Sequence, residues 1–277
     1  MSEADGERVN CDLCGADACE RVIAKAGTFY CRCRQCGFVY ANPRPRSATA
    51  DSERYFAYQR GHYIEATYSA RRQRAYRRTL SRLRRHRRTG RLLELGCSVG
   101  GFLYRAREMG WAPVGVEIVP SCAEYARQAW GLEVVCRPLE RADLPADAFD
   151  VVYSNALLEH LPRPGRAMRE VARVLRPGGV VYTKTINLGS YTHELLGDDW
   201  SLLRPDVHPS LFTPETLKRC CTQAGLEVVG IRSSGVRIPN GRGNGLTRAL
   251  RKTALSWLSR VTLKGDRLAL LARKPGR

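Results

Sequence analysis

The sequence has no long hydrophobic run. Its longest stretch without Asp, Glu, Lys or Arg is ten residues, Leu95–Tyr104, whereas a helix that spans a membrane needs about 20 apolar residues. The first eight residues, Met-Ser-Glu-Ala-Asp-Gly-Glu-Arg, are polar and mostly acidic, unlike a secretory signal peptide. We therefore expect a soluble, cytoplasmic protein.

Acidic residues and lysine are also scarce. The 277 residues include 46 Lys+Arg against 27 Asp+Glu, for a net charge of +19, and only six of the basic residues are Lys. Residues 71–91 hold eleven Arg and no acid, and residues 232–277 hold twelve Lys or Arg and one acid, Asp266. The rest of the chain sums to −3, so the protein is a nearly neutral body with two basic segments. GC-rich coding explains an Arg excess as readily as RNA binding does, so the charge alone identifies no partner.

The remaining composition is that of a globular protein, with 43% hydrophobic and 26% charged residues. Such a chain buries a real core, which argues against a wholly disordered, collagen-like or coiled-coil protein.

Cysteine, in contrast, is abundant and clustered near the N-terminus. Four of the eleven Cys form two CxxC pairs separated by eighteen residues: Cys11, Cys14, Cys33 and Cys36. This spacing is typical of a tetrahedral Zn²⁺ site, because each pair supplies two thiolates from one tight turn. We expect a structural zinc ribbon over residues 1–45, with Cys31 as an alternative ligand to Cys33. Reduced thiols or a redox pair are the other interpretation.

Residues 46–90 join this segment to the rest of the chain. The first part is aromatic, with Tyr55, Phe56, Tyr58, Tyr63 and Tyr68, and the second part is the first basic segment. The aromatic cluster predicts either a lid over a ligand or packing between the ribbon and the main domain.

From residue 91 onward, strand and helix patterns alternate. Short apolar strands are predicted at 91–95, 112–116, 132–135, 149–153, 180–185, 226–231 and 267–272, with helices at 102–109, 121–130, 166–175 and 214–224. Alternating β and α units predict an α/β fold with a doubly wound, mostly parallel sheet of seven strands. We therefore expect one Rossmann-like domain over residues 91–277.

The loop after the first of these strands has the features of a ligand site. Gly96, Gly100 and Gly101 allow close approach of the backbone, although the dinucleotide fingerprint GxGxxG is absent. Glu117 ends the next strand, where a carboxylate can accept hydrogen bonds from both hydroxyls of a ribose. In open α/β sheets, ligands bind at the carboxyl ends of the strands.

These segments resemble the class I S-adenosylmethionine-dependent methyltransferases. The matching motifs are Leu92-Leu-Glu-Leu-Gly-Cys-Ser-Val-Gly-Gly-Phe102, Gly115-Val-Glu117, Phe149-Asp-Val-Val152, Leu157-Leu-Glu-His-Leu161 and Leu175-Arg-Pro-Gly-Gly179. The resemblance spans about residues 90–275. Within this family, a narrower resemblance is to the ubiquinone-methylase-like type, whose members carry an N-terminal CxxCG…CxxCGxxY segment.

The resemblance implies an S-adenosylmethionine site and a role for each matching residue. Glu94 and Gly96 would line the methionine end of the cofactor, within the same loop as Gly100, and Glu117 would bind the ribose. The further implied contacts are Ile118 beside the adenine, Leu139 and Glu140 at the adenine edge, and Asn155 facing the methionine moiety. Ubiquinone methylases have an extra acid where this chain has Asn155 and use it for a divalent metal, so the case for a magnesium site is weaker here.

Methyl transfer needs few catalytic side chains, because much of the rate comes from holding the acceptor against the methyl group. A hydroxyl or an acidic carbon as acceptor also needs a base. His160 is the first candidate and His208 the second, since histidine titrates near neutral pH; the alternative for each is a structural bond to the backbone. Trp200 and Asn187 either line the acceptor pocket or serve ordinary packing.

The predicted function is therefore methyl transfer to the oxygen or carbon of a small biosynthetic metabolite. The alternative is an RNA methyltransferase that uses the zinc ribbon and the Arg71–Arg91 segment on RNA phosphates. A scaffold protein without turnover is a third interpretation.

A basic helix is predicted near residues 245–263, and it carries an apolar stripe of Leu246, Leu250, Ala254, Trp257, Leu258 and Val261. This helix either contacts an anionic membrane surface or inserts between the last two strands and packs on the body.

Overall fold

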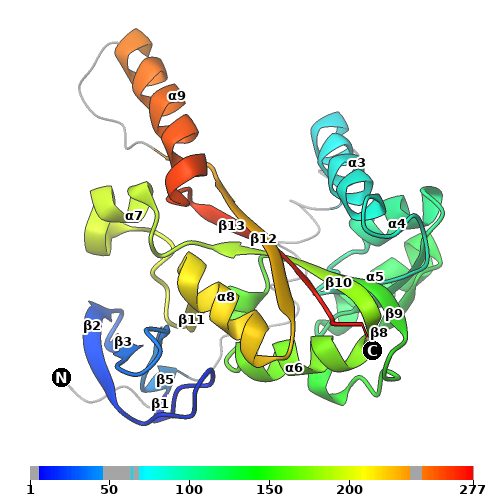
Figure 1. Cartoon of the computed structure of the whole chain (residues 1–277), viewed down its shortest axis with the longest axis horizontal. Coiled ribbons are helices and arrows are strands. Elements are labelled where there is room, and N and C mark those ends of the chain that lie inside the picture. Colours follow the sequence, from blue (N-terminus) through cyan, green and yellow to red (C-terminus); the bar gives the residue numbers. More distant parts are fainter. Residues whose placement is uncertain (1–5, 46–63, 65–68, 238–244, 277) are drawn as a thin grey trace.

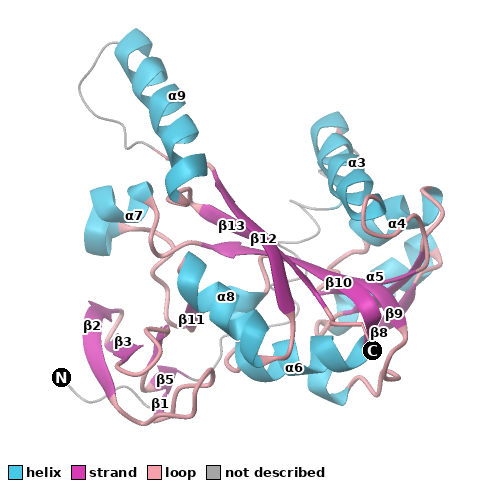
Figure 2. Cartoon of the chain, in the orientation of Figure 1, coloured by secondary structure: helices cyan, strands magenta, loops and turns pink. Residues whose placement is uncertain are grey.

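A computed structural model describes residues 6–45, 64, 69–237 and 245–276. Seven strands form one twisted sheet with helices on both faces (Figures 1 and 2). Their order across the sheet is β12 (Glu227–Ser234), β13 (Arg267–Arg273), β10 (Leu175–Ile186), β9 (Phe149–Asn155), β6 (Arg91–Leu95), β7 (Ala112–Val116) and β8 (Glu133–Val135). The predicted doubly wound, Rossmann-like α/β fold is confirmed.

The strands from β10 to β8 run parallel, and β13 is antiparallel to both β10 and β12. Strand β9 is buried along six of its seven residues, and β6 along four of five. Strands covered on both faces need continuous apolar sequence. This requirement explains why these two strands were readable as short hydrophobic runs.

Successive strand residues point to opposite faces and so build two cores. On one face, Leu92 and Val151 pack against α3 (Ala70–Arg84), α4 (Gly101–Glu108) and α5 (Pro120–Trp130). On the other face, Leu93 and Val152 pack against α6 (Pro164–Val174) and α8 (Pro214–Gln223). Proline at the first position starts α5, α6 and α8, where its missing N–H costs nothing.

Two features differ from the sequence prediction. Strand β10 begins at Leu175, five residues before the expected start, and its register shifts between Leu175 and Val180. A short helix, α7 (Tyr191–Leu196), follows it. It is too short to show a clear helical period, and three single turns of 3₁₀-helix escape prediction for the same reason: η3 (Leu139–Arg141), η4 (Leu158–His160) and η5 (Gly197–Asp199).

The cysteine-rich segment folds as a small antiparallel sheet of β2 (Cys19–Lys25), β3 (Thr28–Cys33) and β4 (Val39–Ala41), with β1 (Gly6–Glu7) paired to β5 (Arg44–Pro45). Its edge strand β4 pairs with β11 (Ser210–Leu211), which comes from the C-terminal half of the chain. Phe38 also packs against Phe212, with ring centroids 5.2 Å apart. The segment therefore shares both a sheet and a core with the main domain.

Residues 46–63 and 65–68 of the expected linker lie outside the described residues, and they include all five members of the aromatic cluster. Within it, Ile64 is described and packs against Val99, Val119 and Cys122. The lid interpretation thus stays a prediction.

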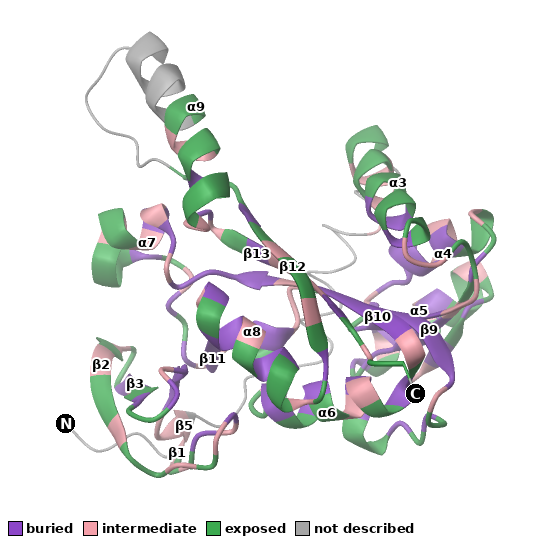
Figure 3. Ribbon diagram, viewed as in Figure 1, coloured by how far each residue is buried: buried purple, intermediate pink, exposed green. Residues whose placement is uncertain are grey.

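The basic helix near the C-terminus is α9 (Gly245–Thr262), and it does lie between β12 and β13 in the chain. Figure 3 colours most of its described residues as exposed. Trp257 is 66% exposed and Val261 68%, so the described part of the apolar stripe, Ala254 to Val261, does not pack on the body. Among the described residues, no helix combines the length and hydrophobicity that crossing a bilayer requires.

Candidate cofactor and acceptor site

The loop between β6 and α4 adopts a conformation that requires glycine at two positions. Gly96 has φ +66° and Gly100, which caps α4, has φ +79°, and a residue with a side chain rarely adopts such angles. A Cβ on Gly100 would also lie 2.9 Å from the Cβ of Ala126, and one on Gly96 would lie 3.1 Å from Leu157 Cδ1. The glycines therefore bring the loop close to α5 and to the segment that follows β9.

Glu117 directly follows β7 beside this loop and is 5% exposed. Its Oε2 accepts a hydrogen bond from the Ser98 N–H at 2.8 Å, and its Oε1 accepts one from the Val119 N–H at 3.0 Å. Burial raises the pKa of Glu117, and these N–H donors oppose the rise. A carboxylate has about four acceptor positions, so two remain, which suits the two hydroxyls of a ribose.

Glu94 lies on β6 and is 7% exposed. Its Oε2 is buried and has no hydrogen-bond partner among the described residues. Burial, together with the nearby Glu117, raises its pKa well above the ordinary value. An unpaired buried acceptor is costly, and a ligand ammonium would both pair with it and favour its charged form. The amino group at the methionine end of S-adenosylmethionine fits this position.

The other residues that are expected to contact the cofactor differ in how far they are exposed. Ile118 is 51% exposed, so it is available to cover a planar base. Asn155, at the end of β9, and Glu140 are exposed as well. Leu139 is instead buried in the core with Ala142 and Leu144, which leaves its side chain little area for a ligand.

The two candidate bases are distant in sequence but adjacent in space. The rings of His160 and His208 are 4.8 Å apart between centroids, in an edge-to-face arrangement. His160 Nδ1 lies 2.9 Å from the Val207 carbonyl oxygen, and His208 Nδ1 lies 2.8 Å from the Leu202 carbonyl oxygen. Desolvation lowers the pKa of both histidines. A neutral His160 that donates from Nδ1 presents an unprotonated Nε2, the form that a base needs.

The position of His208 is fixed by the cysteine-rich segment. Tyr30, on β3, is fully buried, and its hydroxyl donates to the His208 carbonyl oxygen at 2.8 Å. The Ala41 N–H of β4 donates to the carbonyl oxygen of Pro209. The small sheet thus anchors the chain on both sides of the His208–Pro209 peptide bond.

Sequence reasoning missed two polar residues at this edge of the sheet. Glu159 is 1% exposed and accepts a hydrogen bond from Thr185 Oγ1 at 2.7 Å. Lys184 pairs with Asn155 in the β9–β10 register and donates to Thr79 Oγ1 at 3.2 Å. Burial, and then the charges of Arg82 and Arg267, lower the pKa of Lys184 to about 8. A lysine at the end of an otherwise buried strand was the signal that could have identified it.

Asn187 and Trp200 serve packing rather than an acceptor pocket. Asn187 is fully buried, and its Nδ2 donates to the carbonyl oxygens of Leu263 and Gly265 at 2.9 and 2.7 Å. Trp200 is 2% exposed within the core that also contains Tyr30. Of the two interpretations given for these residues, burial and these contacts favour packing for both.

Comparison with known proteins identifies the family. A sequence model described as a methyltransferase domain matches residues 68–231, which is more than half of the chain. The chain belongs to this methyltransferase family. It is a class I S-adenosylmethionine-dependent methyltransferase, as its motifs indicate.

Two curated relatives show how far the similarity extends. The methyltransferase is 30% identical over 140 residues to the malonyl-[acyl-carrier protein] O-methyltransferase of Serratia marcescens, covering 50% of this chain and 54% of the relative. It is 31% identical over 155 residues to the ubiquinone biosynthesis O-methyltransferase of Bordetella pertussis, covering 51% and 64%. The chain therefore spans less than two thirds of either relative.

Solved structures share the fold at low identity. A chain in the complex between the Haloferax volcanii Trm112 methyltransferase activator and a methyltransferase is 17% identical, with a TM-score of 0.58, covering 83% of this chain and 99% of that chain. An S-adenosylmethionine-dependent methyltransferase from Archaeoglobus fulgidus is 21% identical, with a TM-score of 0.54, covering 79% and 99%.

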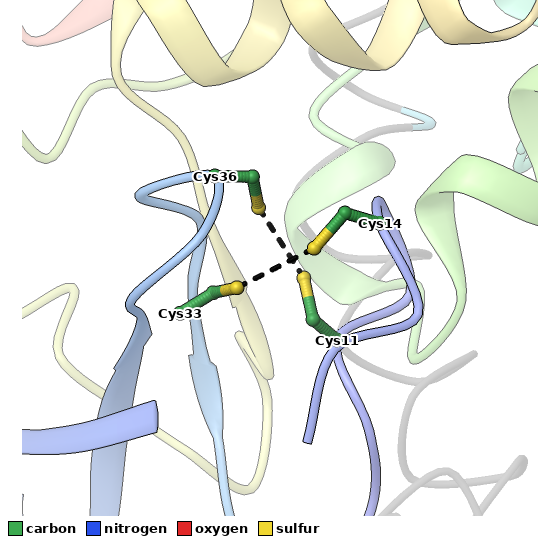
Figure 4. A group of neighbouring side chains, drawn as sticks. All are labelled: Cys11, Cys14, Cys33 and Cys36. Carbon is green, nitrogen blue, oxygen red and sulfur yellow. Dashed lines mark hydrogen bonds between the residues drawn. The ribbon is translucent and has the colours of Figure 1, made fainter. Parts of the chain in front are cut away.

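The four predicted cysteine ligands of the methyltransferase come together. The sulfur atoms of Cys11, Cys14, Cys33 and Cys36 all lie within 4.8 Å of one another (Figure 4). Tetrahedral Zn²⁺ with bonds of about 2.3 Å separates its sulfur ligands by about 3.8 Å, and the Cys11–Cys36 and Cys14–Cys33 sulfurs are 3.4 and 3.5 Å apart. Cys31 is outside this group, and its thiol donates to the Asn42 carbonyl oxygen.

Two of these thiols, Cys11 and Cys36, are poorly placed to ionise without a cation. Burial raises the pKa of Cys11, and it raises that of Cys36 to about 11. A bound dication reverses this effect, because it stabilises adjacent thiolates directly. The donor set therefore fits Zn²⁺.

The methyltransferase also has an arginine-lined hollow of about 950 Å³ between the cysteine-rich segment and α6. Arg44, Arg163, Arg166 and Arg169 line it, together with the acids Glu7 and Asp12. Asp12 Oδ2 accepts the Gly165 N–H at the start of α6, at 2.5 Å. The hollow lies away from the glycine loop, so it belongs to a different surface from the cofactor site.

Proposed function

We propose that this methyltransferase transfers the methyl group of S-adenosylmethionine to an oxygen or carbon atom of a small-molecule acceptor. The observation that carries the proposal is the His160–His208 pair beside the glycine loop. His160 belongs to the same turn as Leu157, which contacts Gly96. A base at this position suits an acceptor that must lose a proton, and both curated relatives described above are O-methyltransferases by name.

The cofactor, when bound, supplies a sulfonium-bound methyl group that an acceptor atom can displace. Glu94 would hold the amino group of the cofactor, and Glu117 would hold its ribose hydroxyls. Gly96 and Gly100 would let the loop approach the bound molecule. The remaining contacts in the proposed site are Ile118, Leu139, Glu140 and Asn155.

The pH dependence of turnover distinguishes the two groups that could accept the proton. If His160 is the base, the rate rises with pH through a pKa below 6.5 and is flat above it, because the pKa of His160 is lowered. If Lys184 is the base, the rate rises through a pKa near 8. We expect the transition at the lower pKa, that of His160. His160→Ala should remove this transition, and the matched variant Lys184→Met should retain it. A single transition near 8 that disappears in Lys184→Met would reject His160.

A transfer screen with labelled cofactor tests the proposed function. We expect wild-type protein to bind S-adenosylhomocysteine by calorimetry and to label a component of a small-molecule extract but not total RNA. A protein that fails to bind S-adenosylhomocysteine would overturn the cofactor assignment. Label in RNA would instead show that the acceptor is RNA and not a small molecule, and it would leave the cofactor assignment intact.

RNA is the second candidate acceptor, and the arginine-lined hollow favours it. The guanidinium groups there, together with those of α3, could neutralise phosphates. In the screen, this candidate requires label in RNA that decreases steeply as the salt concentration rises. Arg166→Gln with Arg169→Gln should then reduce RNA labelling, and the exposed Arg137→Gln is the control outside the hollow.

We also infer that Cys11, Cys14, Cys33 and Cys36 bind one structural Zn²⁺. All four positions of a tetrahedron are taken by sulfur, which leaves none for water or substrate. The metal would therefore support folding and not the chemistry of transfer.

A further inference from the structure

Helix α9 exposes an apolar stripe that the body of the protein does not cover. Ala254, Trp257, Leu258 and Val261 follow the i, i+3, i+4, i+7 spacing of one helix face. All four are exposed, Trp257 and Val261 by about two thirds and Leu258 by 40%. Trp257 and Val261 are the two most exposed large apolar side chains among the described residues.

The opposite face of α9 holds the helix to the sheet. Ser259 is fully buried, and its carbonyl oxygen accepts a hydrogen bond from Ser233 Oγ on β12. Leu255 and Ser256 are half-buried on the same side. This contact fixes the rotation of the helix, so the apolar stripe is directed outward by the structure itself.

The surroundings of the stripe are strongly basic. Residues 232–277 carry twelve Lys or Arg and one acid. Four of these basic residues belong to α9, and Arg260 among them is exposed. In the view of Figure 1, α3 projects from the same side of the molecule as α9. Helix α3 contains no acid at all, so this side combines an apolar ridge with two basic helices.

We infer that α9 docks this methyltransferase on an anionic lipid membrane surface. A helix with one apolar face and basic flanks lies in the plane of the headgroups, with its apolar side chains at the acyl boundary. Trp257 suits that boundary, because an indole has both an apolar body and a polar N–H. RNA would attract the arginines but would leave Leu258 and Val261 exposed, since aliphatic side chains do not stack on bases. The inference does not depend on the identity of the acceptor.

Vesicle binding tests this inference with the intact protein. The probe is phosphatidylcholine vesicles with and without phosphatidylserine, and the readouts are co-sedimentation and tryptophan emission. Trp111 and Trp200 are buried and Trp130 is half-buried, so a blue shift on binding would report mainly on Trp257. We expect binding that requires phosphatidylserine, weakens with salt and shifts the emission to the blue.

Two pairs of variants separate the apolar contribution from the charge. Trp257→Ser combined with Val261→Ser should weaken vesicle partitioning by about tenfold or more, because apolar area no longer enters the membrane. Leu195→Ser is the matched control, since Leu195 is 59% exposed on α7 and lies outside the stripe. Arg251→Gln combined with Arg260→Gln should weaken binding to phosphatidylserine vesicles only. Circular dichroism checks that each variant is folded.

Three outcomes would overturn the inference. The first is equal binding to vesicles with and without phosphatidylserine, or to neither. The second is vesicle binding that the Trp257→Ser, Val261→Ser variant retains in full. The third is that the wild-type protein binds no vesicles but self-associates or binds RNA, and that this variant loses that association. The stripe would then be assigned to a second copy of the chain or to RNA.

Discussion

The two halves of this site are assembled from the chain in different ways. Glu94, Gly96 and Glu117 belong to one continuous strand–loop–helix–strand unit, from β6 to the end of β7. Tyr30, His160 and His208 instead come from three distant segments. The His160–Val207 and Ser210–Leu161 hydrogen bonds hold the two histidine loops together, and the β4–β11 pairing adds Tyr30 to them. The proposed cofactor half is therefore local and close to self-sufficient, whereas the proposed acceptor half also receives support from a small sheet more than 100 residues away in sequence.

The largest expected effect comes from replacing Cys33, one of the four proposed zinc ligands. We expect Cys33→Ser to abolish binding of one zinc per chain and to lower the free energy of unfolding by more than about 4 kcal/mol, because metal binding is coupled to folding. Metal analysis and chemical denaturation would measure both effects. Below the unfolding temperature, S-adenosylhomocysteine affinity should change less than turnover does.

Cys31→Ser is the matched control, because Cys31 is equally buried on the same strand but outside the sulfur cluster. It should retain the metal and cost about 1 kcal/mol. Equal loss of stability in both variants would show that the cluster has no special role.

A change at Glu117 should affect the cofactor half alone. We expect Glu117→Ala to weaken S-adenosylhomocysteine binding by about 100-fold, since it removes the two proposed charge-assisted hydrogen bonds to the ribose and leaves the Ser98 and Val119 N–H groups unpaired. Calorimetry measures the affinity, and the metal content should be unchanged. Glu124→Ala on the exposed surface of α5 is the control, and similar affinities for the two variants would argue against a ribose contact.

The smallest expected effect comes from Tyr30→Phe, which tests the link between the halves. Loss of its hydrogen bond to the His208 carbonyl should lower stability by about 1 kcal/mol and lower turnover while leaving cofactor affinity unchanged. Tyr40→Phe is the matched control, because Tyr40 is equally buried but its hydroxyl makes no hydrogen bond to a described residue. If turnover falls equally in both variants, the contact does not position His208.

The difference between the halves also explains what the sequence could predict. The fold could be predicted, and so could the place of Glu94, Gly96, Gly100 and Glu117 around one loop, because periodicity and positive-φ glycine are local signals. Their roles toward the cofactor stay predictions. The proximity of His160 and His208 could not, because it depends on contacts between loops that are far apart in sequence, such as His160 with Val207 and Ser210 with Leu161. The choice between packing and a pocket for Trp200 and Asn187 stayed open for a similar reason: their partners, in the ribbon core and in the turn before β13, lie far away in sequence.

The pairing of β4 with β11 has a consequence for dividing the protein into parts. Removal of residues 1–45 would not release an independent catalytic domain. It would uncover an unpaired strand edge at Ser210–Leu211 and the ring of Phe212, which is fully buried in the intact chain. Open edges and exposed apolar surface promote association between molecules. The N-terminal segment thus also protects the rest of the chain from aggregation.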